Sequence, residues 1–175
     1  MSFAVTALKR AFARRLPFVL LLAGVIAPVQ AGTAMNPAEA EARNHLIVRE
    51  AFDGWAEGSA SVFDLLAPDI RWTIHGSGPV AGTYTGIEEF MERAAHPLVS
   101  RLATPLKPDL HHIWASGDHV IIRFDASAIT NAGAPYNNRF VWIFRMEAGS
   151  VTEAEAFLDL AAYRQVIENN EPRAE

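Results

Sequence analysis

Residues 119–160 of this chain read HVIIRFDASAITNAGAPYNNRFVWIFRMEAGSVTEAEAFLDL. Three runs rich in β-branched and aromatic residues, at 119–129, 136–146 and 151–160, are separated by turn sequences that contain Gly133 and Gly149. A fourth run, at 110–115, precedes them across the turn sequence Ser116-Gly117-Asp118. Because short turns join neighbouring antiparallel strands, this stretch predicts an antiparallel meander.

The residues before the meander favour helices. At 37–57, apolar side chains recur at spacings of three and four, with Asn36 and Glu39 placed to cap the start and Gly58 to end the helix. A short helix is expected at 61–66, a strand at 69–75 and a third helix at 86–101. Helices gathered ahead of a long antiparallel sheet predict an α+β domain. We expect a cone in which the helices pack on the concave face of a curved sheet.

The first 31 residues have the pattern of a secretion signal. Four basic residues precede an apolar run at 16–29, and Val29-Gln30-Ala31 offers small residues at the positions a signal peptidase requires. We therefore expect cleavage near Ala31 and export to the periplasm or the medium, with no stable membrane insertion afterwards. A retained anchor is the alternative, although Pro17 and Pro28 leave the run short of the roughly 20 residues of a full span. Arg14-Arg15 leaves both Sec and twin-arginine export open.

The expected organisation is a signal peptide at 1–31, a linker at 32–37, one domain at 38–170 and a disordered tail at 171–175. The chain has no cysteine, which excludes disulfides, thiolate metal sites and a cysteine nucleophile. Without residues 1–31 the formal charge becomes −9, against −5 for the whole chain. So acidic a domain is repelled by phosphate backbones, and we expect no nucleic-acid partner.

Several stretches resemble the SnoaL-like, ketosteroid-isomerase-related proteins of the nuclear transport factor 2-like superfamily. The resemblance covers residues 40–168 and rests on Trp72, the run 76–86, Tyr136-Asn137-Asn138 and the run 154–159. It implies a cone fold whose pocket binds a small, mostly apolar molecule, and a homodimer formed through the outer sheet face. The fold hosts isomerases, epoxide hydrolases, polyketide cyclases and proteins without known chemistry, so it leaves the activity open.

Arg123-Phe124-Asp125 is the sharpest local feature. Residues two apart on a strand share a face, so Arg123 and Asp125 project together, opposite Phe124. If they share the pocket with Glu155, the arginine can orient two carboxylates, one as base and one as acid. This set resembles limonene-epoxide hydrolase and implies a cofactor-free hydrolase or isomerase, with His75 as an auxiliary group. The alternatives are ordinary cross-strand ion pairs on a solvated face, and a protein that binds without catalysis.

The expected pocket lining combines aromatic side chains with a few polar groups that fix orientation. The predicted ligand-binding residues are Trp72, Tyr84, Asn138, Phe140, Trp142, Phe157 and Asp159. His111 and His112 point to opposite faces of a strand and cannot chelate one ion together. We therefore predict neither a metal nor another cofactor.

Overall fold

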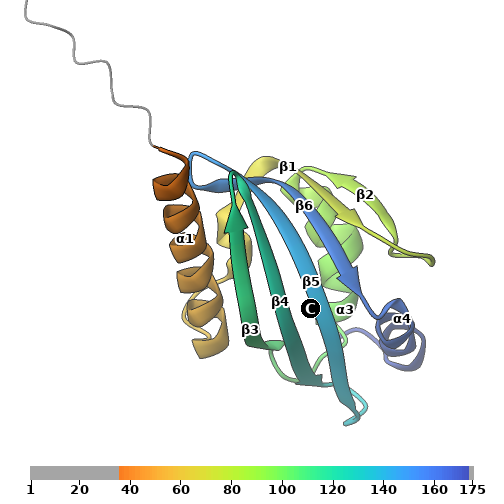
Figure 1. Ribbon diagram of the computed structural model, residues 1–175. Helices are drawn as coiled ribbons and strands as arrows, with labels where there is room; N and C mark the ends of the chain where they lie inside the picture. The colour runs from red at the N-terminus through yellow and green to blue at the C-terminus, as the bar shows by residue number, and fades with distance from the viewer. Residues whose placement is uncertain (1–35, 174–175) are drawn as a thin grey trace, which may run out of the picture. The chain divides into compact units, whose positions relative to one another are not determined.

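A computed structural model describes residues 36–173, and the predicted signal at 1–31 lies outside the described residues. Within them the chain forms one curved six-stranded sheet with helices against one of its faces, as Figure 1 shows. The predicted α+β fold class is confirmed. We call the face that packs against the helices the inner face and the opposite one the outer face.

The strands are β1 (Leu66–Ile74), β2 (Gly82–Thr85), β3 (Lys107–Ser116), β4 (His119–Ile129), β5 (Pro135–Glu147) and β6 (Ser150–Leu158). Their order in the sheet is β2-β1-β6-β5-β4-β3. The strands β3 to β6 form the predicted antiparallel meander. β1 pairs with β6 in parallel, placing Trp72 beside Ala154. This long-range pairing joins the first strand to the far end of the meander.

The helical elements are α1 (Pro37–Glu57), the 3₁₀ turn η1 (Val62–Leu65), α2 (Ile87–Phe90), the π-helical segment η2 (Met91–Ala95), α3 (His96–Val99) and α4 (Leu160–Asn169). The predicted cap of α1 is confirmed, because the Asn36 side chain accepts a hydrogen bond from the Glu39 amide at 2.9 Å. α1 packs against β3 and β4, whereas α2 packs against β1 and α4 against β5.

Two elements differ from the sequence prediction. No strand was predicted at residues 82–85, which pair with β1 as the short edge strand β2. The last strand, predicted to reach residue 160, ends at Leu158, and α4 follows. Asp159 starts this helix because its carboxylate accepts hydrogen bonds from the amides of Ala161 and Ala162, at 2.9 and 3.1 Å. α4 closes one end of the space between the helices and the sheet.

The core lies on the inner face, where alternate residues of β4 and β5 are buried. Ile122 and Phe124 are fully enclosed and pack with Trp142 and Phe144 beneath α1 and Phe52. Their neighbours in sequence point outward, as period-two alternation requires. The hairpin between β5 and β6 turns at Ala148 and Gly149, whose φ angles of 51° and 92° match the positive values of a tight two-residue turn.

Both ends of the described region have definite contacts. At the C-terminal end, the Arg173 amide donates to the Ser100 carbonyl at 2.8 Å, although residues 171–175 were expected to be a disordered tail. No helix among residues 36–173 is long and apolar enough to cross a membrane.

Candidate functional site

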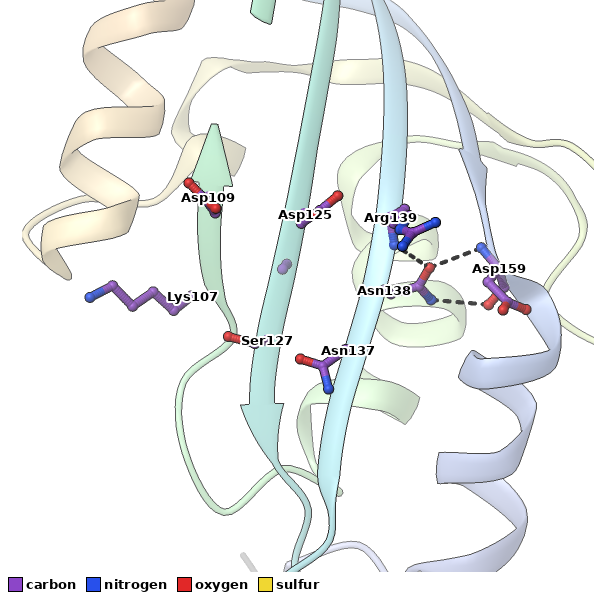
Figure 2. Close-up of a pocket in the computed structure, with 9 residues that line it drawn as sticks. Lys107, Asp109, Asp125, Ser127, Asn137, Asn138, Arg139 and Asp159 are labelled. Atoms are coloured by element: carbon purple, nitrogen blue, oxygen red, sulfur yellow. Dashed lines mark hydrogen bonds between the residues drawn. The ribbon is translucent and has the colours of Figure 1, made fainter. Parts of the chain in front are cut away.

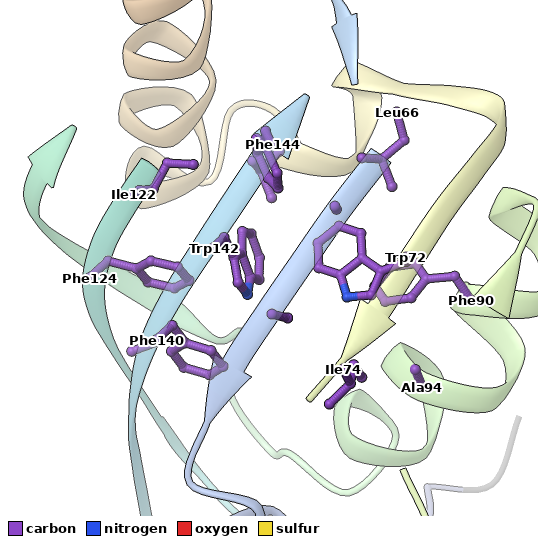
Figure 3. Close-up of a cluster of buried hydrophobic side chains, with 14 of the residues drawn as sticks. Leu66, Trp72, Ile74, Phe90, Ala94, Ile122, Phe124, Phe140, Trp142 and Phe144 are labelled. Atoms are coloured by element: carbon purple, nitrogen blue, oxygen red, sulfur yellow. The ribbon is translucent and has the colours of Figure 1, made fainter. Parts of the chain in front are cut away.

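A cavity of about 280 Å³ lies between the inner face of the sheet and the helices. β1, β5 and β6 form its floor, and η2, α3 and α4 contribute its walls. Figure 3 shows six of its lining residues, Trp72, Ile74, Phe90, Ala94, Phe140 and Trp142. The residues around it are Trp55, Phe63, Trp72, Ile74, Phe90, Ala94, Ala95, Leu98, Val99, Pro105, Leu106, Phe140, Trp142, Ala156, Leu158 and Tyr163.

Close ring contacts hold the aromatic lining in place. Trp72 stacks on Phe90 with ring centroids 4.2 Å apart and meets Trp142 edge to face at 5.1 Å. Trp142 in turn stacks on Trp55, which comes from α1, at 6.1 Å. Because offset-stacked and edge-to-face pairs are the favourable arrangements, the helices and the sheet fix one another through these rings. The cavity wall is therefore preorganised.

The cavity offers few polar groups. The Tyr163 hydroxyl donates to the Ala94 carbonyl at 2.9 Å, and burial raises the pKa of Tyr163 far above its ordinary value. The indole nitrogen of Trp72, a residue only 1% exposed, has no hydrogen-bond partner within residues 36–173. No carboxylate, imidazole, ammonium or guanidinium group is among the described side chains that line the cavity. The cavity therefore holds no acid–base pair from the described region.

The predicted catalytic residues Arg123 and Asp125 do share a face of β4, but it is the outer one. Their side chains contact each other at 2.5 Å, and His111 approaches Asp125 at 3.4 Å. Burial raises the pKa of Asp125, but the hydrogen bonds from Arg123 and His111 outweigh it and hold that pKa below its ordinary value. The expectation that these side chains enter the pocket is wrong, because Phe124 between them occupies the inner face.

Glu155 also lies on the outer face, apart from Asp125. On β5, Glu155 is opposite Ile143 whereas Asp125 is opposite Arg139, so the two carboxylates are offset by four residues along β5. Glu155 instead pairs with His75 at 2.8 Å, and the two side chains are 52% and 40% exposed. The four residues thus form two separate, partly solvated polar pairs and not one enclosed catalytic set.

A polar hollow of about 510 Å³ covers one end of the outer face and includes Asp125 (Figure 2). Lys107, Asp109, Ser127, Asn137 and Arg139 surround it from β3, β4 and β5. Like charges stand opposite each other here, since Asp109 pairs with Asp125 across the strands. No group of three or more metal-binding side chains occurs within residues 36–173.

Asn138 and Asp159, predicted to bind a ligand, form a structural joint instead. The Asn138 amide group donates to the Tyr136 hydroxyl at 2.9 Å and to the Asp159 carbonyl at 3.0 Å. Its oxygen accepts from the amides of Arg139 and Asp159, at 2.7 and 2.9 Å. Figure 2 shows three of these bonds. Every hydrogen-bonding position of the amide is thereby occupied, and β5 is tied to the start of α4.

The other predicted ligand-binding residues divide between the two faces. Trp72, Phe140 and Trp142 line the cavity as predicted. Tyr84 is buried, but its hydroxyl donates to the Val80 carbonyl at 2.7 Å and it does not line the cavity. Phe157 is on the outer face, 42% exposed and stacked on His75.

Sequence reasoning missed several lining residues from the helices. Trp55 belongs to the apolar stripe of α1, and Phe90 belongs to that of the predicted third helix. Their helical spacing marked them as inward-facing, but it did not show that a cavity remained beside them. Tyr163 was missed because the helix that carries it was not predicted.

Residues 48–154 match the sequence profile of the SnoaL-like domain. No curated protein sequence matches the chain. Among solved structures, an NTF2-like protein from Burkholderia thailandensis E264 is 24% identical with a TM-score of 0.58, covering 71% of this chain and 96% of its own.

Two further structures are similar in fold. A candidate SnoaL-like polyketide cyclase from Jannaschia sp. CCS1 is 20% identical with a TM-score of 0.60, over 79% of this chain and 100% of its own. TerC, co-crystallized with polyporic acid, is 23% identical with a TM-score of 0.56, over 73% of this chain and 99% of its own. At such identities the likeness concerns the fold, not the activity.

Proposed function

The chain belongs to the SnoaL-like domain family, and from that premise we propose that it binds a small, mostly apolar molecule in the cavity between its helices and its sheet. The observation that carries this proposal is the cavity itself, which is preformed, about 280 Å³ in volume and lined largely by aromatic and aliphatic side chains. Ligand pockets are typically apolar concavities of about 300–1,000 Å³, so this one, just below that range, suits a small ligand.

Access to the cavity is supported by a neighbouring groove. A wider groove of about 740 Å³ shares Trp55, Pro105 and Leu106 with the cavity lining. We propose that a ligand enters from this groove, between α1 and the segment at 103–106. That TerC was co-crystallized with polyporic acid is consistent with a fold that accommodates organic molecules.

Binding without catalysis accounts for the positions of the ionisable groups better than a hydrolase or isomerase does. General acid–base catalysis requires the acid and base within hydrogen-bond reach of the reacting atoms. Arg123, Asp125 and Glu155 lie on the other side of the sheet from the cavity, partly exposed to solvent. We therefore assign them no role in the chemistry of a cavity ligand.

The binding proposal is tested with N-phenyl-1-naphthylamine, a neutral probe whose fluorescence rises in apolar surroundings. We expect saturable binding at one site per chain. Ala94 is buried in the cavity wall, so A94L fills the space with three further carbon atoms and should abolish the signal while leaving the thermal melting temperature unchanged or raised. The control A161L makes the same change at an exposed position on α4. Equal probe binding by both folded variants would refute the proposal.

We further propose that the protein acts after export, with residues 1–31 removed. The support is the order of basic residues, apolar run and small residues around Ala31. Mass spectrometry of the protein recovered from the periplasm or medium should give an N-terminus close to Gly32. Full-length protein found only in the cytoplasm, or held in the membrane fraction, would contradict it.

A second proposed function is self-association through the outer face. Trp114, Ile121 and Ile143 are neighbours across β3, β4 and β5, and Val141 and Phe157 adjoin them. We call these five residues the outer stripe. Trp114 is 52% exposed and Phe157 42%, and large exposed apolar patches usually mark an interface.

A second copy of the chain suits the outer stripe because the same apolar patch on two copies can pack against itself. A two-fold axis through the stripe would place Trp114 and Phe157 of one copy against the exposed apolar side chains of the other. W114S should shift the molar mass measured by light scattering from dimer to monomer. L46S, which removes an equally exposed leucine from α1, should remain dimeric. A monomeric wild-type protein would refute this second function.

A further inference from the structure

The indole N–H of Trp72 is a buried donor without an acceptor. Trp72 lies in the middle of β1 on the inner face, and 1% of the residue is exposed. Its nitrogen is the one buried side-chain polar atom without a hydrogen-bond partner among residues 36–173. The nearby hydroxyls of Tyr84 and Tyr163 each donate to a backbone carbonyl. The protein thus satisfies its other buried donors here and leaves this one free.

A buried N–H without an acceptor lowers the stability of the folded protein. Its presence indicates that a bound molecule supplies the acceptor. Most buried tryptophans find a partner for their N–H, and an exception needs an explanation. In Figure 3 the nitrogen of Trp72 is on the side of the ring that points toward Ile74, which also lines the cavity. The donor is thus on the side of the ring that faces Ile74, from which we expect the acceptor atom of a cavity ligand to approach.

The rest of the lining restricts the chemistry of that acceptor. No charged side chain from the described region lines the cavity, so a carboxylate or phosphate on the ligand would be buried without a counter-charge. A neutral oxygen carries no such cost. The Tyr163 hydroxyl is already engaged with the Ala94 carbonyl. Trp72 is therefore the donor left to recognise an oxygen.

Resting on the proposed binding function, we propose that Trp72 is a specificity-determining residue whose indole N–H donates to an uncharged oxygen acceptor of the ligand, such as a ketone carbonyl. The ligand class is an apolar, uncharged carbonyl compound. Trp72 selects it over an acceptor-free molecule of the same shape, because the latter leaves the donor unpaired in the complex. The aromatic side chains contact both molecules equally, and the Trp72 N–H favours the one that has the carbonyl oxygen.

Fluorenone and fluorene test this inference, because they share a ring frame and differ in the presence of a carbonyl. For each protein we compare the Kd of fluorene with the Kd of fluorenone. The ratio of these two values should be about tenfold higher in the wild-type protein than in W72F. W114F is the control, since it makes the same ring change at an exposed tryptophan outside the cavity lining and should keep the wild-type ratio. The carbonyl stretching frequency of bound fluorenone should shift down in wild type and W114F and return in W72F.

The outcomes separate this inference from the binding proposal. If both probes bind but the ratio of their Kd values is the same in W72F, or the bound carbonyl shows no shift in the wild-type protein, Trp72 does not select the ligand and the inference fails alone. If neither probe binds, and N-phenyl-1-naphthylamine also fails, the cavity is not a binding site. Because the infrared shift is measured on the wild-type protein, the test stands even if W72F does not fold.

Discussion

Asn138 provides the most direct test of how β5 holds α4 against the cavity. The residue is 4% exposed, and its side chain makes four hydrogen bonds, two within β5 and two with Asp159, the residue that caps α4. N138A removes all four without adding bulk. It leaves the Tyr136 hydroxyl and three backbone groups, the amide and carbonyl of Asp159 and the amide of Arg139, without this partner.

The expected loss follows from these three backbone groups. An unpaired buried polar group costs about 1–3 kcal/mol. Asp159 and Arg139 are themselves exposed, so water can reach part of this joint and the lower end of the range applies. We therefore expect N138A to lower the free energy of unfolding by about 3 kcal/mol. That is a large share of the roughly 5–15 kcal/mol that stabilises a typical domain.

Urea denaturation followed by fluorescence measures this loss, with N137A as the matched control. Asn137 is the preceding residue on the same strand, but it is exposed on the outer face. Its replacement should change the free energy of unfolding by less than about 0.5 kcal/mol. Hydrogen exchange should also show faster exchange of the α4 amides in N138A, because α4 loses its attachment to β5.

A third variant tests the direction of the hydrogen bonds. N138D keeps the shape and both accepting contacts, but it replaces the donating NH₂ with an oxygen that faces the Asp159 carbonyl. Protonation relieves this contact, so the deficit of N138D relative to wild type should shrink as the pH falls. If N138A is as stable as N137A, or if N138D is equally affected at all pH values, the reasoning about this joint is wrong.

Three further predictions follow from single positions. G76A should melt at a lower temperature than G78A. Both glycines have φ near 125°, but only at Gly76 would an added Cβ lie 2.6 Å from Leu160 Cδ1. Equal melting temperatures would show that the Leu160 side chain moves away without cost. The pKa of Asp125 is lowered in the folded state, so the stability it contributes is present above its unfolded pKa of about 4 and is lost as the pH falls through the folded value. D125N should make the loss of stability at low pH shallower. Because a surface ion pair contributes little, it should also leave probe binding unchanged within about twofold. A loss of binding would show that Asp125 contributes to the cavity. Burial raises the pKa of Tyr136 to about 12, so about 2–3 kcal/mol of stability present below pH 10 should be lost between about pH 10 and 12. Y136F should make that alkaline decline shallower in pH-dependent urea melts, and an unchanged slope would contradict the assignment.

The sequence was informative wherever structure depends on neighbours along the chain. The cap of α1 at Asn36 and the strand at 119–129 were predicted with their observed bounds. Both depend on side chains within a few residues of each other, which a linear pattern records directly. α4 also had a local signal, because Asp159 is a good N-cap and Tyr163 and Val166 lie three residues apart on one face. It was missed because the preceding strand was extended to residue 160, over the cap and first residue of the helix.

The sequence did not show which face of the sheet lines the cavity. Alternation on β4 correctly separated Arg123 and Asp125 from Phe124. Their polarity favoured the outer face, and only the resemblance to an acid–arginine–acid enzyme placed them in the pocket. The register of β4, β5 and β6 then shows that Glu155 and Asp125 do not meet.

By itself, the sequence determined the α+β class, the first helix, the meander and the pairs of residues that share a face, because these follow from contacts between neighbours in the chain. Only the tertiary structure decided that β1 joins β6 in parallel and that α4 closes the cavity. It also decided that Trp72 keeps an unpaired N–H beside that space. Each depends on groups far apart in the sequence, and the presence of a cavity depends on how completely their side chains fill the volume between helices and sheet, which no linear pattern records.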